Sequence, residues 1–150
     1  DRFGYVPSHP NFIVPGKRPL SSMSPIMVEN RHTGALELIV GSSGGSRIIT
    51  ANILTTYAYL SHHGQVSMDD VIARPRWHDQ LLPPVTVFEY PGAQTPGFDN
   101  ATVRALTAKG HQAAYTAPGL SNAQAIQHTH AGSWHAASER RQYEARGAAI

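Results

Sequence analysis

Residues 41–47 read GSSGGSR and lie between an apolar run and a segment with helical spacing, which is a common setting for chemistry. The pattern G-x-S-x-G predicts a nucleophile elbow, in which Ser43 would attack an acyl group with help from an acid and a histidine. Alternatively, Gly44 and Gly45 present backbone N–H groups to an oxyanion at the positive end of a helix, and the nucleophile lies elsewhere. A purely structural turn with Ser46 as the helix N-cap is an equally simple interpretation.

A second candidate site is the segment KRPLSSMSP, residues 17–25, in which three hydroxyls stand between two prolines. Hydroxyl groups on a proline-stiffened segment can hold a carboxylate by hydrogen bonds, and the stiffness reduces the entropy lost on binding. Ser21 and Ser22 are the central pair of this set. From composition alone, an ordinary serine-rich turn is favoured over a binding site.

Other reactive residues give weaker patterns. A serine esterase would combine Ser43 with Asp99 and with either His111 or His130. The nine histidines show no strong ligand spacing and cysteine is absent, so surface or capping roles are expected and no metal site is predicted. The cluster RPRWHD, residues 74–79, combines bases with an aromatic residue and is interpreted as a packed structural turn.

Length and composition limit the class of protein. A chain of 150 residues with 41% hydrophobic residues has the size and composition of one globular domain or part of one. The formal charge is only +2 and the basic residues are scattered, so no nucleic-acid partner is expected. No run reaches 18 apolar residues, and the start at Asp1 lacks a leader, so we expect a piece of a longer gene product. Asn100 begins an N-glycosylation sequon that could equally mark a helix start.

The periodicity predicts an α+β fold with a mostly antiparallel sheet and covering helices. Residues 1–20 are expected to form an extended, proline-rich connector. The expected strands are 26–29, 35–40, 86–90, 112–115, 123–128 and 133–137, and the expected helices are 48–60, a short one after 67 that Pro75 ends, and 99–109. Because an elbow normally sits on a parallel sheet, a hairpin strand entering GSSGG disfavours Ser43 as the nucleophile.

Several segments together resemble one enzyme family, the γ-glutamyltransferases, also called γ-glutamyl transpeptidases or glutathione hydrolases. Residues 15–25 resemble the family's PxKRPLSSMSP, and residues 41–50 resemble its GSPGGSRIIT. Residues 73–78 are similar to its APRFHH, and residues 123–126 to its late AQAI strand. The resemblance extends over nearly all of the chain, and its first two motifs are long and specific.

The resemblance implies an N-terminal-nucleophile hydrolase fold, a four-layer αββα sandwich formed when a precursor cleaves itself into a large and a small subunit. Residues 1–150 would be the C-terminal portion of the small subunit. Ser21 and Ser22 would bind the α-carboxylate of a γ-glutamyl group, and Gly44 and Gly45 would form the oxyanion hole. A threonine outside this chain would attack glutathione or another γ-glutamyl compound and pass the group to water, an amino acid or a peptide, without metal or cofactor.

The same resemblance implies partners and a location. The partners would be the large subunit and the N-terminal part of the small subunit, both from one precursor, and the location extracellular, periplasmic or on a membrane-anchored ectodomain. Without its nucleophile, the chain by itself should be inactive. It departs from the family at Ser43, commonly proline, at Ile26, commonly threonine, and at Glu139, commonly aspartate. A serine esterase using Ser43 and a non-catalytic relative remain the alternative functions.

Overall fold

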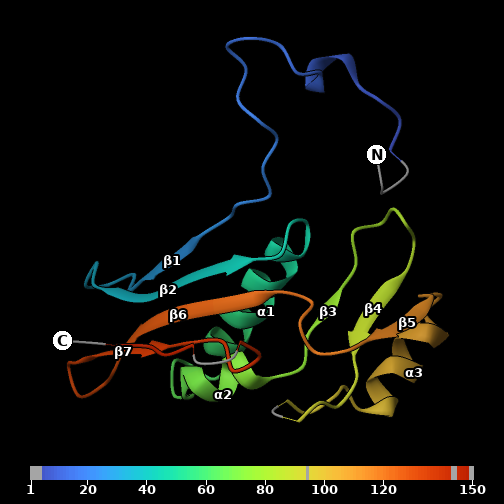
Figure 1. Ribbon diagram of the computed structural model, residues 1–150. Helices are drawn as coiled ribbons and strands as arrows, with labels where there is room; N and C mark the ends of the chain where they lie inside the picture. The colour runs from blue at the N-terminus through green and yellow to red at the C-terminus, as the bar shows by residue number, and fades with distance from the viewer. Residues whose placement is uncertain (1–4, 94, 143–144, 149–150) are drawn as a thin grey trace.

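The structure is a computed structural model that describes residues 5–93, 95–142 and 145–148. It is an α+β fold with two sheets and three α-helices within these residues (Figure 1). The strands are β1 (Ile26–Glu29), β2 (Leu36–Ser43), β3 (Trp77–His78), β4 (Thr86–Glu89), β5 (Ala113–Thr116), β6 (Asn122–His128) and β7 (Trp134–Ala137). The helices are α1 (Arg47–Ser61), α2 (Met68–Ala73) and α3 (Asn100–Ala108), with a 3₁₀ turn η1 (His9–Asn11). Every predicted strand and helix is confirmed; β3 was not predicted.

The larger sheet is antiparallel throughout, with strand order β1-β2-β6-β7. Both predicted hairpins, β1–β2 and β6–β7, are present. Strand β2 continues three residues further than predicted, because Gly41–Ser43 pair with residues at the start of β6. The glycine-rich turn therefore begins directly at a strand end and leads into α1.

The smaller sheet has the order β3-β4-β5 and contains both kinds of strand pairing. β3 and β4 are antiparallel, but β4 and β5 are parallel, with Thr86 opposite Ala113. A parallel pair needs a crossover connection, which α3 provides between these strands. The fold is thus mostly, and not wholly, antiparallel.

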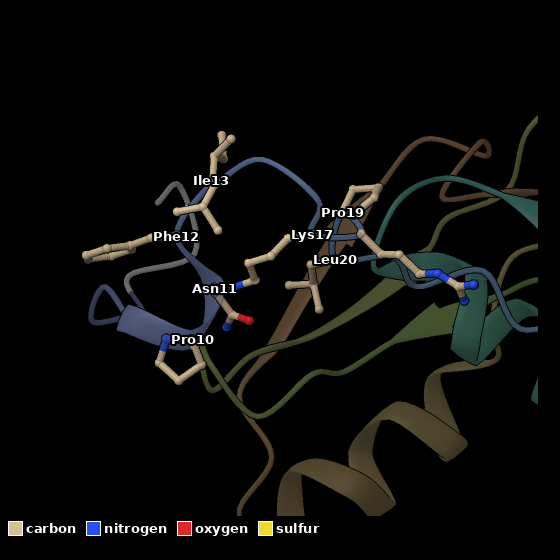
Figure 2. A pocket seen from close by; sticks show the side chains of 9 residues that line it. Pro10, Asn11, Phe12, Ile13, Lys17, Pro19 and Leu20 are labelled. Atoms are coloured by element: carbon tan, nitrogen blue, oxygen red, sulfur yellow. The ribbon is translucent and has the colours of Figure 1, made fainter.

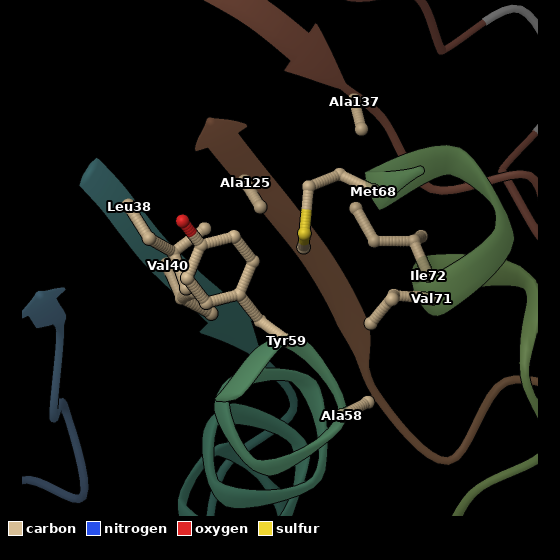
Figure 3. Packing of buried hydrophobic residues seen from close by; sticks show 9 residues of the cluster. All are labelled: Leu38, Val40, Ala58, Tyr59, Met68, Val71, Ile72, Ala125 and Ala137. Carbon is tan, nitrogen blue, oxygen red and sulfur yellow. The ribbon is translucent and has the colours of Figure 1, made fainter. Parts of the chain in front are cut away.

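The core lies between one face of the larger sheet and helices α1 and α2 (Figure 3). Side chains alternate across the sheet, so Leu38 and Val40 are buried on the helix side. Met68 and Ile72 of α2 and Tyr59 of α1 point into the same cluster (Figure 3). The opposite face has an apolar row across all four strands, formed by the paired residues Met27, Ile39, Ile126 and Ala136.

Helix α1 presents an unusual face to this core. Apart from the core residue Tyr59, its buried residues are small or polar: Ala51, Asn52, Thr55 and Ala58. Its large apolar residues Ile49, Ile53, Tyr57 and Leu60 follow the predicted helical spacing, yet all four are exposed. The helix ends at Ser61, and the chain leaves it through His63 and Gly64, whose φ values are +52° and +72°. The Gly64 N–H donates to the Tyr59 carbonyl at 3.0 Å.

Before β1 the chain runs as an exposed segment that loops away from the sheets (Figure 1). Residues 10–20 curl around a shallow hollow lined by Phe12, Lys17 and Leu20 among others (Figure 2). This segment delivers Ser21 and Ser22 to the body of the domain. Within the described residues, no helix is long and apolar enough to cross a membrane.

Candidate active site

The turn between β2 and α1 has the geometry of an anion cradle. Gly44 and Gly45 have φ values of +136° and +64°, which favour glycine. Their carbonyls accept from the Arg47 and Ile48 N–H groups of the first helical turn, at 3.4 and 3.1 Å. Within the described part of the chain, neither the Gly44 nor the Gly45 N–H donates a hydrogen bond. Two unused donors at the positive end of α1 can stabilise a negative oxygen.

Gly44 is also constrained by a close approach of the chain. A Cβ at this position would lie 3.2 Å from the Cα of Ser121 and 3.3 Å from the Leu120 carbonyl oxygen. A Cβ at Gly45 would meet nothing within 4 Å. The backbone therefore requires glycine at Gly44 for two reasons, and at Gly45 because of φ alone. Ser46 is the helix N-cap residue, as the structural interpretation predicted, but its side chain makes no capping hydrogen bond.

The serine segment lies against this turn. The Ser22 hydroxyl donates to the Gly45 carbonyl at 2.6 Å, joining two motifs that are 23 residues apart. Ser21 lies next to it, and its oxygen accepts from the Met23 N–H at 3.1 Å. The structure thus brings Ser22 and the two glycines together, with Ser21 adjacent in the chain.

A buried asparagine, missed from the sequence, holds the serine segment in place. Asn52 of α1 donates to the Ser24 carbonyl at 2.5 Å and to its hydroxyl at 3.3 Å. Its side-chain oxygen accepts from the Ser42 hydroxyl at 2.6 Å. One side chain therefore ties the serine segment, the end of β2 and α1 together. The available signal was a polar residue at an interior position of an otherwise apolar helix.

A second polar chain lies beside the turn, where Gly44, Arg47, His78 and Gln80 line a cleft. The Gln80 amide donates to the Leu82 carbonyl at 2.8 Å, which turns its oxygen toward Nε2 of His78, also at 2.8 Å. The Gln80 oxygen in this position can accept a hydrogen bond from Nε2 of His78. On the other side of the ring, Nδ1 lies 2.8 Å from the Thr50 hydroxyl of α1.

Two buried ion pairs connect the sheets behind the site. The guanidinium of Arg76 contacts Glu139 at 2.6 Å and that of Arg141 contacts Glu89 at 2.7 Å, and all four side chains are almost wholly buried. Arg141 also bonds to Glu139 at 2.9 Å, which makes one network of two positive and two negative charges. The cluster RPRWHD, which contains Arg76, is packed as predicted, but it is not a turn, because Trp77 and His78 form strand β3 and pair with β4.

This network positions the chain next to Gly44. Arg76 donates to the Ser121 carbonyl at 2.5 Å, and Glu89 accepts from the Leu120 N–H at 3.2 Å. Residues 120 and 121 are the ones that approach Gly44 most closely. Burial lowers the pKa of Arg76, and the charge of Arg141 lowers it further. Burial raises the pKa of Glu139, but the charge of Arg76 and the Ala123 N–H outweigh it and hold that pKa below its usual range.

The residues of a Ser43 triad are not brought together. Ser43 pairs with Asn122 at the start of β6, whereas His130 follows the other end of that strand, more than about 20 Å along the chain direction. Asp99 caps α3, accepting from the Thr102 N–H at 2.8 Å and hydroxyl at 2.7 Å, and these bonds lower its pKa. His111 lies 3.6 Å from Asp79 instead. Among the described residues, none of these three candidates forms a hydrogen bond with Ser43.

Several histidines have the expected surface or capping roles, whereas His78 is buried between Thr50 and Gln80. Nδ1 of His62 lies 2.8 Å from the Ala58 carbonyl at the end of α1, and His135 pairs with Asp69 at 2.8 Å. His130 is exposed in the turn between β6 and β7. No cluster of metal-ligating side chains occurs among the described residues. Asn100 is exposed at the first residue of α3, the helix start that the sequence allowed.

The family model for gamma-glutamyltranspeptidase matches residues 1–149. The chain belongs to the gamma-glutamyltranspeptidase family, an enzyme family. A glutathione hydrolase from Aspergillus flavus is 36% identical over 124 residues, which are 83% of this chain and 20% of that protein. A glutathione hydrolase proenzyme from Schizosaccharomyces pombe is 44% identical over 88 residues, 58% of this chain and 13% of that protein. The chain therefore spans about a fifth or less of the length of these curated relatives.

Solved structures of family members share the fold. A mutant gamma-glutamyltranspeptidase from Helicobacter pylori matches with a TM-score of 0.78 at 30% identity, covering 93% of this chain and 72% of that one. The enzyme from Pseudomonas nitroreducens in complex with L-DON matches with a TM-score of 0.77, covering 99% and 72%. The fold is accordingly that of the N-terminal-nucleophile hydrolases, as the resemblance implied.

Proposed function

We propose that residues 1–150 are the C-terminal portion of the small subunit of a γ-glutamyltransferase. The whole protein would take a γ-glutamyl group from glutathione or a related compound and transfer it to water, an amino acid or a peptide. Its partners would be the large subunit and the N-terminal part of the small subunit, both from one precursor. The proenzyme names of the relatives support this assignment, and the family resemblance supports a location outside the cytoplasm.

The observation that carries the proposal is the contact between the two motifs. The 2.6 Å hydrogen bond from Ser22 to the Gly45 carbonyl brings the Ser22 hydroxyl next to two unused N–H donors, and this proximity supports a joint role in binding substrate. In the ground state, Ser21 and Ser22 would hold the α-carboxylate of the γ-glutamyl group. A bound carboxylate would compete with the Gly45 carbonyl for the Ser22 hydroxyl proton.

In the reaction, a threonine hydroxyl outside this chain would add to the γ-carbonyl carbon. The carbonyl oxygen would gain negative charge and accept from the N–H groups of Gly44 and Gly45. In comparable sites one such donor contributes about 3–4 kcal/mol of transition-state stabilisation. Collapse of the intermediate would break the bond to the leaving amine, and the γ-glutamyl ester would then pass to water or an acceptor.

The second sheet of the αββα sandwich would lie on the face of the larger sheet opposite α1 and α2. The row of Met27, Ile39 and Ile126 faces away from α1 and α2; in the described structure Met27 and Ile126 are exposed and Ile39 between them is half-buried. We expect the second sheet, from the preceding part of the small subunit, to pack against this row. Such packing would bring a strand-borne threonine to the side of the sheet opposite the helices.

The proposal is tested with the full-length protein and a γ-glutamyl anilide. We expect turnover in the wild type and near-normal turnover in Ser43→Ala. In Ser22→Ala we expect the KM to rise at least about tenfold, which corresponds to about 1.4 kcal/mol of lost binding free energy. Loss of nearly all activity in Ser43→Ala would instead support the esterase. Absence of turnover in the wild type would support a non-catalytic relative.

A further inference from the structure

We propose that the outer face of α1 is the docking surface for the part of this protein outside residues 1–150, namely the large subunit. This inference rests on the proposed function, because it takes the chain to be one piece of a processed precursor. The surface is the stripe formed by Ile49, Ile53, Tyr57 and Leu60 together with the hollow beside it.

The polarity of α1 is the first observation. The four stripe residues recur at helical spacing and are 46%, 54%, 69% and 51% exposed, whereas the inward face holds Asn52 and Thr55. Between Ile48 and Ser61 the helix contains no charged residue. A helix that is apolar on its outer side and carries no charge after its first residue belongs to a protein interior rather than to a solvated surface.

Helix α3 of the same chain provides the contrast. It buries Val103 and exposes Arg104 and Ala105, and Lys109 follows its end. This is the usual pattern of a helix that faces water on one side. The two helices differ in what their outer faces are built to contact, although both lie on the surface of residues 1–150.

The hollow beside the stripe indicates what the partner presents. It has a volume of about 230 Å³ and is lined mainly by apolar side chains, including Leu54, Tyr57, Trp77 and Phe98. Exposed Arg74 stands at its rim, with its guanidinium 3.4 Å from Nε2 of His62. The chemistry fits an apolar helix face that inserts one large side chain and places a carboxylate opposite Arg74.

The remaining length of the protein identifies the occupant. The chain covers 20% of the Aspergillus flavus relative, so most of such a protein lies outside these residues. The second sheet of the sandwich would cover the other face of the larger sheet, at Met27 and Ile126, and would leave the outer side of α1 open. A further layer is needed for the stripe, and the large subunit is the part that can supply it.

Cysteine labelling of the full-length protein tests the surface with mild substitutions. Residues 1–150 contain no cysteine, so Ile53→Cys and Ala105→Cys each introduce one thiol whose peptide can be followed by mass spectrometry. We expect N-ethylmaleimide to modify residue 53 at least about tenfold more slowly than residue 105. This ratio corresponds to an equilibrium constant of about ten in favour of the state in which α1 is covered. Denaturant should abolish the difference.

Three results would overturn the proposal. Equal labelling rates would show that the stripe is solvated in the intact protein. Protection that appears only as protein concentration rises would assign the stripe to a second copy. Protection that appears only with phosphatidylglycerol vesicles would assign it to a lipid surface. None of these readouts requires γ-glutamyl turnover, so the labelling result and the activity assay fail independently.

A disruptive variant gives a second measurement. We expect Ile53→Asp to prevent recovery of the two processed subunits as one complex on size exclusion, whereas Ala105→Asp, with the same charge on α3, should leave the complex intact. An intact complex in both variants would contradict the proposal.

Discussion

Replacing Glu139 by glutamine should destabilise the domain far more than its small size change implies. The Glu139 side chain is fully buried and accepts from Arg76 at 2.6 Å, from the Ala123 N–H at 3.0 Å and from Arg141 at 2.9 Å. The substitution keeps the shape but removes one of two negative charges that balance two buried arginines. One uncompensated buried charge remains.

The expected loss follows from this imbalance. Breaking a buried ion pair by removing one partner costs about 3–5 kcal/mol, and retained hydrogen bonds from the amide oxygen place Glu139→Gln near the lower end, about 3 kcal/mol. That loss corresponds to roughly 150-fold in the ratio of folded to unfolded protein. Because the network also fixes Leu120 and Ser121 against Gly44, kcat should fall together with stability.

The assay is urea unfolding of the full-length protein followed by tryptophan fluorescence. The matched control is Glu29→Gln, which removes a carboxylate from an exposed position in β1 and should change the free energy of unfolding by less than about 0.5 kcal/mol. A second variant, Glu139→Gln with Arg76→Met, removes the unpaired cation as well and should lose less than the sum of the single variants. Glu139→Gln behaving like Glu29→Gln, or additive losses in the double variant, would refute this reasoning.

Three further outcomes are expected of the full-length protein. Asn52→Ala should raise the KM for a γ-glutamyl anilide about tenfold, because the Ser24 carbonyl loses its partner and the serine segment loosens; an unchanged KM would separate Asn52 from the site. Gly44→Ala should lower both stability and kcat, since its Cβ would press on Ser121, and circular dichroism melting with initial rates would detect either change. The lowered pKa of Glu139 contributes stability that is present above the unfolded pKa of about 4.3 and is lost as pH falls through the lower folded value. At pH values below about 4, the urea concentration at the unfolding midpoint should therefore decrease, and it should decrease less in Glu139→Gln.

Local patterns in the sequence were sufficient to predict most helices and strands, whereas the contact between Ser22 and Gly45 depends on the tertiary structure. Apolar runs joined by turn-rich links predicted both hairpins, and 3.6-residue spacing predicted α1 and α3. The N-cap at Ser67, the acids after it and Pro75 predicted α2. Each of these patterns reflects a preference within a short segment. Strand β3 was missed since two residues have no measurable period. The parallel pairing of β4 with β5 was missed because it depends on where α3 returns the chain.

The parts of the site that depend on distant contacts could not be predicted. Nothing local indicates that Asn52 would bond to Ser24 or that Arg76 would meet Glu139, 63 residues later. Tertiary packing also decides which side of α1 faces the sheet. The spacing of the isoleucines shows that they share one face of the helix, but it does not show what that face contacts. The role of Gly44 and Gly45 could be predicted, because it depends on backbone N–H groups and on positive φ values that glycine adopts within a short turn.

The central claim is that GSSGGSR supplies an oxyanion hole while the nucleophile lies outside residues 1–150. The most direct measurement is covalent trapping of the full-length protein with L-DON, a compound present in the Pseudomonas nitroreducens complex, followed by peptide mapping. We predict modification of a threonine outside residues 1–150 and an unmodified Ser43. Modification of Ser43 would contradict the account.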